Sequence, residues 1–302
     1  GAVGQELLSV LEQRKFPISS LRLLASARSA GKRTIAMGTE FELQEANVTS
    51  FDGVDIAFFA AGGGVSKLLA PEAVKNGAVV VDKSSAWRME PNVPLVIPEV
   101  NPEDIERHQG IISSPNCSTI VMLMALAPLH KANPLKRVIV DTYQSASGAG
   151  GRGISELILQ TKAYLGDNEP QYATFPHPLA FNVIPQVEEF TADGYTTEEI
   201  KMQTETQKIL HFPGLPVSAT CVRVPVTTSH SEAVHVGFTH PMSPQDAREI
   251  LARSAGVRVI DEIRQQRYPM ALDAAGKDEV FVGRIRTDHA LDNGLAFWTV
   301  GD

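Results

Sequence analysis

The first hundred residues alternate between a helical spacing of apolar positions and short, almost continuously apolar runs. In residues 2–13 the apolar side chains recur every three or four positions, which predicts an amphipathic helix. Three apolar runs follow, and they lie at residues 21–26, 54–60 and 78–82. Both faces of these runs are apolar, which is typical of parallel strands that helices cover on both sides.

A glycine-rich turn at residues 62–64 and a helix-compatible stretch at residues 65–76 lie between the last two runs. The order strand, glycine turn, helix, strand defines a βαβ unit, and several in series predict a Rossmann-type, doubly wound parallel sheet. The helix at residues 2–13 needs a strand before it in such a sheet. We therefore expect the molecule to extend N-terminally beyond Gly1, with the first strand upstream.

The pattern changes near residue 117, where a long apolar helix is predicted over residues 118–132. Two further helices are predicted at residues 151–165 and 196–210. Strands are predicted at residues 135–147, 217–226, 229–240, 278–287 and 294–302. This order predicts an α+β domain with a mixed or antiparallel sheet and helices on one face. We accordingly expect one domain over residues 1–117 and a second over residues 118–302.

Length, composition and charge narrow the class of protein. At 302 residues the chain exceeds a typical single domain, and 43% hydrophobic with 21% charged residues argues against disorder. The net charge of −8 argues against a dedicated nucleic-acid-binding protein. No apolar run reaches the roughly 20 residues that a membrane-spanning helix needs. The 2 cysteines form no disulfide framework and favour a reducing, cytoplasmic compartment.

The strongest candidate for chemistry is Cys117, in the run SSPNCSTI. A predicted strand ends just before it and the apolar helix begins at or just after it. A thiol at a helix N-terminus faces unpaired N–H groups and the positive end of the helix dipole, and both stabilise the thiolate. The same N–H groups can hold an oxyanion. The alternative is a structural cysteine beside a helix cap, which is the role expected for Cys221 in its apolar run.

A thiolate nucleophile is commonly paired with a base, and His230 is the best candidate among the 8 histidines. It lies at the start of a predicted strand, directly after a break in the chain. His177 and His211 look like loop residues, whereas His235 and His240 fit ordinary strand positions. A solvated loop histidine is the alternative for His230.

Basic residues near such a site could bind an anionic substrate. Arg88 follows a predicted strand at its carboxyl end, where ligands bind in open α/β sheets. Arg223 lies in an otherwise apolar strand, so it needs either a buried carboxylate of the protein or a substrate carboxylate. Glu198 and Lys201 are three positions apart and share a helix face, which is also typical of a solvated ion pair.

The opening GAVG resembles the end of a dinucleotide-binding glycine turn. The strand at residues 21–26, the second of the expected sheet, ends without an acidic residue, and Arg28 and Ser29 come shortly after it. An acidic residue there commonly binds the ribose of NAD, whereas Arg with Ser suits the 2′-phosphate of NADP. We therefore predict NADP as the cofactor, with a solvated loop arginine as the alternative.

Over nearly its whole length the chain resembles the aspartate-semialdehyde dehydrogenase family. The motifs that carry the resemblance are, in order, GAVGQELL, ASARSAGK, SSAWRM, VIPEVN, SPNCSTI, TYQSASGAG, EEIKMQTETQKIL, SATCVRVPV and SHSEAV. The resemblance implies reduction of L-4-aspartyl phosphate with NADPH, which releases phosphate and yields L-aspartate 4-semialdehyde. This step belongs to the biosynthesis of lysine, threonine, methionine and diaminopimelate.

The resemblance also implies roles for individual residues, and no metal ion is among the groups it implies. The catalytic set is Cys117 as the nucleophile that forms an acyl-thioester, His230 as the general acid–base and Gln144 as the residue that positions the acyl group. The substrate-binding set is Arg223 for the α-carboxylate, Glu198 for the amino group, Arg88 and Lys201 for the phosphate, and Asn116. The NADP-binding set is Gly1, Ala2, Val3, Arg28, Ser29, Ser147 and Gly148. Residues 1–117 thereby become an NADP-binding domain and residues 118–302 a catalytic and dimerisation domain.

Some features depart from the family, and other classes of protein remain as alternatives. Lys83 stands where the family usually has Asn, which puts the turn that presents Arg88 in doubt. An N-acyl-glutamyl-phosphate reductase shares the fold, but its nucleophile motif usually reads Pro-Gly-Cys-Tyr rather than Pro-Asn-Cys-Ser. A non-catalytic binding relative and a Cys–His hydrolase are further alternatives. The resemblance implies a cytoplasmic homodimer, with a homotetramer as the alternative, that acts on a small molecule without nucleic-acid or membrane partners.

Overall fold

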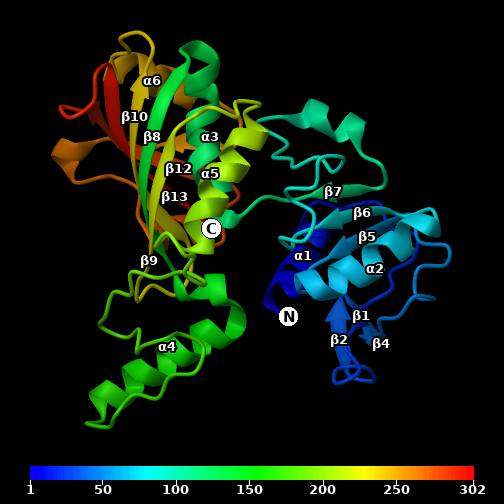
Figure 1. The fold of residues 1–302 in the computed structure, drawn as a ribbon. Helices are drawn as coiled ribbons and strands as arrows, with labels where there is room; N and C mark the ends of the chain where they lie inside the picture. The colour runs from blue at the N-terminus through cyan, green and yellow to red at the C-terminus, as the bar shows by residue number, and fades with distance from the viewer. The chain divides into compact units, whose positions relative to one another are not determined.

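Parallel strands in the first part of the chain form two groups, shown in Figure 1. One group pairs β1 (Leu24–Ala25) with β4 (Gln44–Glu45), and the other has the order β5 (Ile56–Phe59), β6 (Val79–Asp82), β7 (Ile111–Ser113). The computed structural model of the chain describes residues 1–302, apart from the side chain of Ala2. The chain divides into two compact units, Gly1–Pro94 with Asp104–Ser114 and Leu95–Glu103 with Pro115–Asp302.

Two helices accompany these strands in the first unit. Helix α1 (Ala2–Gln13) and helix α2 (Gly63–Lys75) lie where the apolar spacing predicts them. Helix α2 packs Leu69, Ala70 and Ala73 against Phe59 of β5 and Val80 of β6. The strand predicted over residues 21–26 is reduced to the two residues of β1, because only Leu24 and Ala25 pair with β4.

Strand β5 differs from its predicted environment. Ala57 and Phe59 are buried, whereas Ile56 is 44% and Phe58 37% exposed. In the described residues α2 packs on the Ala57 and Phe59 face, and the Ile56 and Phe58 face is only partly covered, which differs from the predicted burial of both faces of this run. A hairpin of β2 (Arg33–Ala36) and β3 (Thr39–Glu42) was not predicted, since its positions are mostly polar or exposed.

The second unit contains a six-stranded mixed sheet, which confirms the predicted sheet type. Its order is β11 (Val257–Val259), β12 (Val280–Thr287), β13 (Gly294–Gly301), β10 (His230–Phe238), β8 (Leu135–Gln144), β9 (Val217–Arg223). The β8–β9 and β11–β12 pairs are parallel and the other pairs are antiparallel. In Figure 1 α3 (Cys117–Ala132) and α5 (Thr197–Ile209) lie along the right-hand side of this sheet, and α6 (Pro244–Ala252) lies near its top.

Helix α3 is the centre of this unit's core. Met122, Leu123, Leu126 and Leu129 are fully buried and form one cluster with side chains of β8, β9, β10 and β13. A helix that is apolar all round is stable only when it is surrounded, and α3 packs on the sheet with α5 and α6 beside it. The unit is completed by α4 (Gly150–Leu165), α7 (Ala271–Ala274) and the 3-10 turns η2 (Ala146–Ala149) and η3 (Ile263–Gln265). A further 3-10 turn, η1 (Pro102–Arg107), lies between β6 and β7 in the chain.

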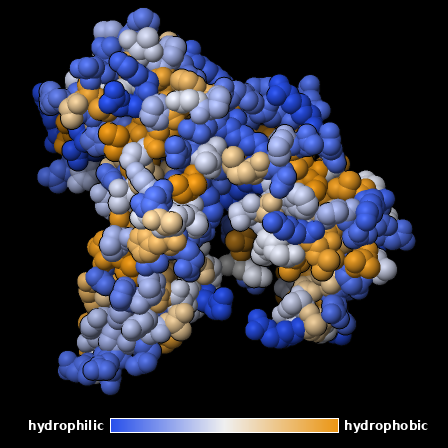
Figure 2. Space-filling model, in the orientation of Figure 1, coloured by the Kyte–Doolittle hydropathy of each residue, from blue (hydrophilic) through white to orange (hydrophobic). Residues whose placement is uncertain are grey.

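Both cysteines are free. Among the described residues, no helix is long and apolar enough to cross a membrane. The same residues contain no group of three or more His, Cys, Asp or Glu side chains that could hold a metal ion. The face of the molecule shown in Figure 2 carries many hydrophilic residues, with apolar patches among them.

Candidate active site

Cys117 is the first residue of helix α3 and is exposed. Asn116 precedes it as the N-cap, and its Oδ1 accepts a hydrogen bond from the main-chain N–H of Thr119 at 3.2 Å. The helix starts here because Asn116, which follows Pro115, is a favoured N-cap residue and an apolar run comes after it. The thiol therefore sits at the positive end of a 16-residue helix, as the sequence predicts.

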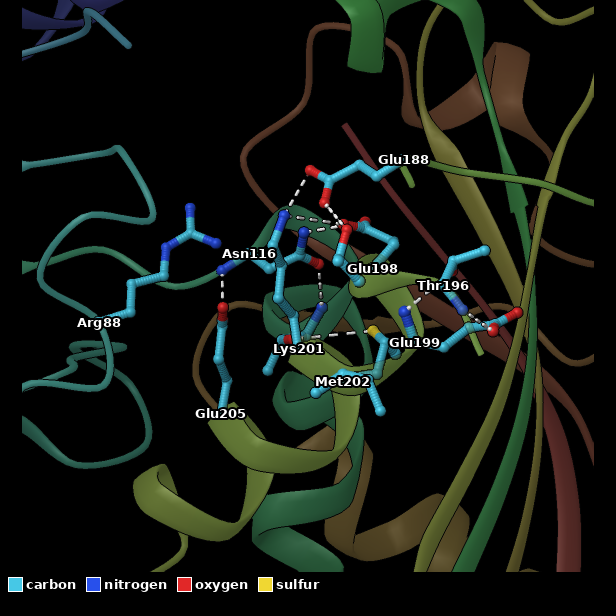
Figure 3. A network of polar contacts seen from close by, with 12 residues as sticks. Arg88, Asn116, Glu188, Thr196, Glu198, Glu199, Lys201, Met202 and Glu205 are labelled. Carbon is cyan, nitrogen blue, oxygen red and sulfur yellow. Dashed lines mark hydrogen bonds and ion pairs between the residues drawn. The ribbon is translucent and has the colours of Figure 1, made fainter. Parts of the chain in front are cut away.

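Side chains of helix α5 hold Asn116, the residue before Cys117, in place (Figure 3). Glu198 Oε1 accepts hydrogen bonds from Asn116 Nδ2 at 2.9 Å and from Gln144 Nε2 at 3.1 Å. Two helical turns further along, Glu205 Oε2 accepts the main-chain N–H of Asn116 at 2.6 Å. Glu198 and Glu205 are almost fully buried, so each fixes its partners in a region that excludes water.

Helix α5 is itself fixed at its N-terminus. Thr196 and Glu199 form a capping box, in which the side chain of each accepts a hydrogen bond from the main-chain N–H of the other. Glu199 Oε1 also accepts the main-chain N–H of Cys221 in β9, at 2.9 Å. Burial raises the pKa of the Cys221 thiol, and nearby carboxylates raise it further. Cys221 is therefore an inert core residue, as predicted from its apolar strand.

Lys201 lies one turn after Glu198 on the same face of α5, as their spacing predicts. Its Nζ lies 3.5 Å from Glu198 Oε2 and contacts Glu188 Oε1 more closely. The Lys201 side chain is only 21% exposed, so the pair is not an ordinary solvated surface contact.

His230, Arg223 and Ser145 form a second cluster in this unit. The main-chain N–H of Ser145 donates to His230 Nδ1 at 3.1 Å, and Arg223 Nη1 donates to the Ser145 carbonyl at 2.7 Å. The Arg223 guanidinium also lies over the ring of Phe175, 5.8 Å from its centroid. A main-chain carbonyl and an aromatic face, rather than a buried carboxylate, are thus the partners of Arg223 that the structure shows.

Gly148, in the η2 turn, lies directly against the side chains of Arg223 and His230. A Cβ atom at this position would lie 2.5 Å from Arg223 Nη1 and 3.2 Å from His230 Nε2. Only glycine leaves that space open. Ser147 is next to it, and its Oγ lies 2.9 Å from Ser145 Oγ.

Burial and charge set the protonation of His230. Burial lowers the pKa of His230 to about 4, with the nearby Arg223 charge acting in the same direction. The ring is therefore neutral near pH 7. Because Nδ1 accepts the Ser145 N–H, the proton of the neutral ring is on Nε2. Burial also lowers the pKa of Arg223, while the charges of Cys117 and Glu198 raise it, which places these groups in one electrostatic environment.

In the first unit, Arg88 is buried in the turn after β6 and donates from Nη2 to the Lys83 carbonyl at 3.0 Å. Asp82 fixes this turn, since its carboxylate accepts Ser84 N–H at 2.9 Å and Ser66 Oγ at 2.9 Å. In this hydrogen bond Arg88 contacts the main chain of Lys83, not its side chain. A lysine in place of asparagine therefore preserves this contact, although the sequence put the turn in doubt.

The residues predicted to bind NADP in the first unit fit a phosphate-bearing ligand. Gly1 is the N-cap of α1 and offers no side-chain cap, and the space at its Cβ position is open. Arg28 is exposed and Ser29 half-buried in the turn that follows β1, and Val3 is 47% exposed. The first N–H groups of a helix and an exposed guanidinium are donors that phosphate groups bind. The side chain of Ala2 lies outside the described residues.

Several contacts around these residues were not predicted. Glu205 shares a helix face with Glu198 at a spacing of seven residues, which was a signal in the sequence. Glu188, Ser145 and Phe175 come from loops and turns whose sequence carries no comparable signal. They join the site only through the folded chain.

Two family models match the chain. Residues 1–108 match "Semialdehyde dehydrogenase, NAD binding domain" and residues 126–302 match "Semialdehyde dehydrogenase, dimerisation domain". Among curated proteins, aspartate-semialdehyde dehydrogenases of Aquifex aeolicus and Bacillus subtilis are each 50% identical, over 100% of this chain and 90% of the relative.

Solved structures give the same result. Aspartate semialdehyde dehydrogenase II of Vibrio cholerae, also solved as a complex with ASA, has a TM-score of 0.97 at 44% identity, covering 100% of this chain and 90% of that one. The enzyme of Candida albicans, solved with NADP, has a TM-score of 0.77 at 25% identity and covers the same shares. On these matches over both of its units, the chain belongs to the aspartate-semialdehyde dehydrogenase family.

Proposed function

We propose that this chain catalyses the NADPH-dependent reductive dephosphorylation of L-4-aspartyl phosphate to L-aspartate 4-semialdehyde and phosphate. The observation that carries the proposal is Cys117 at the N-terminus of α3, tied through Asn116 to Glu198 and electrostatically coupled to Arg223. In this role the chain serves the biosynthesis of lysine, threonine, methionine and diaminopimelate. The names of the relatives favour aspartyl phosphate over the N-acyl-glutamyl phosphate alternative.

The chemistry begins with the Cys117 thiolate, which attacks the acyl carbon of the substrate. The C–S bond forms, the C–O bond to phosphate breaks, and the phosphate leaves with the electron pair. The helix dipole and the Arg223 charge stabilise the thiolate. When bound, NADPH supplies the hydride that reduces the resulting thioester.

His230 acts on the oxyanion that hydride addition forms. The neutral ring would donate its Nε2–H as a hydrogen bond to that oxygen and keep the proton, and it would release the oxygen as the C–S bond breaks, the Cys117 thiolate leaves and the aldehyde forms. The Ser145 N–H keeps Nδ1 as an acceptor and so fixes the tautomer. Gln144, held by Glu198, positions the acyl group.

The substrate is recognised by charge. Arg223 binds the α-carboxylate and Glu198 the amino group, and Asn116 fixes Glu198. Arg88 and Lys201 bind the phosphate, which lowers the negative charge on the leaving group. Arg223 and Glu198 are both buried, and this strengthens a charged contact with a ligand.

For the cofactor, Gly1, Ala2 and Val3 would contact the pyrophosphate, and Arg28 and Ser29 the 2′-phosphate of NADP. Ser147 and Gly148 would lie near the nicotinamide. The corresponding domains are residues 1–117 for NADP and residues 118–302 for catalysis and dimerisation. We further propose a cytoplasmic homodimer, with a homotetramer as the alternative; the match to a dimerisation-domain model supports self-association.

The test uses the protein with L-aspartate 4-semialdehyde, NADP and phosphate, followed by NADPH absorbance. We expect NADPH formation that requires phosphate and that Cys117→Ala abolishes. Cys221→Ala is the matched control and should retain the reaction, because Cys221 is buried and inert.

Three other outcomes would overturn the proposal. Reduction of N-acetyl-glutamyl phosphate alone would show the alternative substrate. Hydrolysis that needs no cofactor would indicate a Cys–His hydrolase, and ligand binding without turnover would indicate a non-catalytic relative.

A further inference from the structure

Lys201 lies between the carboxylates of Glu188 and Glu198, and its Nζ is closer to that of Glu188 (Figure 3). Its Nζ contacts Glu188 Oε1 directly, whereas Glu198 Oε2 is 3.5 Å away. The Glu198 side chain is only 4% exposed and the Glu188 side chain 43% exposed. Burial alone would favour the tighter contact with Glu198, since charges attract more strongly where water is excluded. In the structure, however, Lys201 is closer to Glu188, the more exposed of the two carboxylates.

Glu188 is held in place by its own neighbours. The Thr197 hydroxyl donates to Glu188 Oε2 at 2.7 Å, and Gln186 Nε2 donates to the Glu188 carbonyl at 3.0 Å. The main chain of Glu188 is in the left-handed region, with φ 65°. A non-glycine residue rarely adopts this conformation, so the surrounding contacts fix it. The carboxylate of Glu188 is thus fixed at the start of α5 before any ligand arrives.

The hydrogen bonds of Glu198 show which of its atoms a ligand could use. Its Oε1 accepts from both Asn116 Nδ2 and Gln144 Nε2. Among the described residues, the contact that its Oε2 makes is the long approach of Lys201. Oε2 is therefore the atom that can accept a cationic ligand, provided that Lys201 does not close the 3.5 Å gap.

We propose that Glu188 is a positioning residue that holds Lys201 away from Glu198 and thereby keeps Glu198 Oε2 available to the substrate ammonium. This inference rests on the proposed function, in which Glu198 binds the amino group and Lys201 the phosphate. Without the Glu188 charge, Lys201 moves onto Glu198 Oε2 and forms a closed ion pair. The substrate ammonium then has to displace an ammonium of the protein before it can bind.

The experiment measures the KM for L-aspartate 4-semialdehyde at saturating phosphate and NADP. We expect Glu188→Gln to raise this KM about tenfold and to change kcat by less than about threefold. Glu188→Asp, which keeps the charge, should recover most of the affinity. Glu189→Gln is the matched control, because Glu189 is the exposed neighbour and loses the same charge; it should change the KM by less than about twofold.

Making the same substitution in a protein that lacks the Lys201 ammonium shows whether Glu188 acts through Lys201. In a Lys201→Met protein, no ammonium is left to close on Glu198, so Glu188→Gln should change the KM by less than about twofold. The same tenfold effect in both backgrounds would overturn the inference, because Glu188 would then act on the substrate directly. An unchanged KM in Glu188→Gln alone would overturn it as well.

Failure of the proposed function gives a different result. If Glu198→Gln leaves the KM for L-aspartate 4-semialdehyde unchanged, the role of Glu198 in binding the amino group is wrong. If Glu198→Gln raises the KM but Glu188→Gln does not, only the positioning role of Glu188 is wrong.

Discussion

The main-chain N–H of Ser145 donates to His230 Nδ1 at 3.1 Å, and this contact joins the end of β8 to the start of β10. Because Nδ1 accepts this hydrogen bond, Nε2 carries the proton of the neutral ring. The Ser145 hydroxyl also lies 3.1 Å from Nδ1, but the main-chain donor stays in place whatever side chain position 145 carries. The protonation of His230 thus depends on the sheet that aligns the two strands.

His230 gives the protein a defined pH dependence of stability. The unfolded chain protonates this ring below pH 6.5, whereas the folded chain does so only below about 4, so stability falls as the pH drops through that window. His230→Gln removes this contribution. Between pH 7 and pH 4, wild type should lose roughly 2–3 kcal/mol more of its unfolding free energy than the variant. Urea titrations at several pH values measure this, and parallel curves would contradict it.

Gly148→Ala should reduce activity without unfolding the protein. The added Cβ would lie 2.5 Å from Arg223 Nη1 and 3.2 Å from His230 Nε2, so at least one of these groups must move. We expect a fall in kcat/KM of about a hundredfold, because small displacements of reacting groups are costly. Gly151→Ala in α4 is the control, since its Cβ would meet nothing within 4 Å. Equal activity of the two variants would exclude this role for Gly148.

Asn116→Asp should slow the reaction of Cys117 with iodoacetamide. The aspartate keeps the cap on Thr119 but loses the donor to Glu198 and adds a negative charge beside the thiol. Because negative charge disfavours the thiolate, we expect alkylation at pH 7 to slow about tenfold. Asn116→Ser retains a neutral cap and should slow it far less. Similar rates for the two variants would count against the electrostatic explanation.

Glu232→Gln should stabilise the protein at neutral pH. Glu232 is fully buried in β10, and neither of its oxygens has a hydrogen-bond partner in the described residues. Burial raises its pKa well above 4.5, and the Glu198 charge raises it further. The folded chain keeps this proton where the unfolded chain releases it, so stability falls as the pH rises above 4.5.

The Glu232→Gln variant removes that loss, and we expect a gain of about 1–3 kcal/mol at pH 8 that disappears near pH 4. Thermal unfolding at both pH values measures the gain. Glu199→Gln is the contrasting control, because Glu199 bonds to Thr196 and Cys221 and should lose stability instead. A Glu232 variant that is less stable at pH 8 would show that its carboxyl makes a favourable contact.

Arg28→Ala should weaken the binding of NADP about tenfold or more and the binding of NAD less than about twofold. Arg28 is exposed in the turn after β1, where it can pair with a 2′-phosphate. Arg33→Ala is the control, since Arg33 is also exposed but pairs with Glu40 at 2.9 Å. Fluorescence titration with each cofactor measures the two affinities. Equal losses for NADP and NAD would rule out the 2′-phosphate contact.

The helices of this fold could be predicted well because their signal is local. The apolar spacing locates α1 and α3 to within a residue, and both begin where a glycine or an asparagine provides the N-cap. Strands are harder to predict from sequence, because a strand forms only where a neighbouring strand pairs with it. Residues 21–26 read as one continuous strand in the sequence. In the structure only Leu24 and Ala25 have pairing partners, which are Gln44 and Glu45 of β4. Helix α6 was missed although Ser243 and Asp246 form a capping box at its start.

That a cysteine begins an apolar helix follows from the sequence alone, because a proline, an asparagine and an apolar run are neighbours in the chain. What surrounds that cysteine depends on tertiary packing. Asn116 meets Glu205 across 89 positions of sequence, and His230 meets Ser145 across 85. Local patterns carry no information about such pairs, since they exist only after the core has packed helix α5 and strand β10 against their neighbours. The charge, tautomer and spacing of the site are therefore properties of the fold.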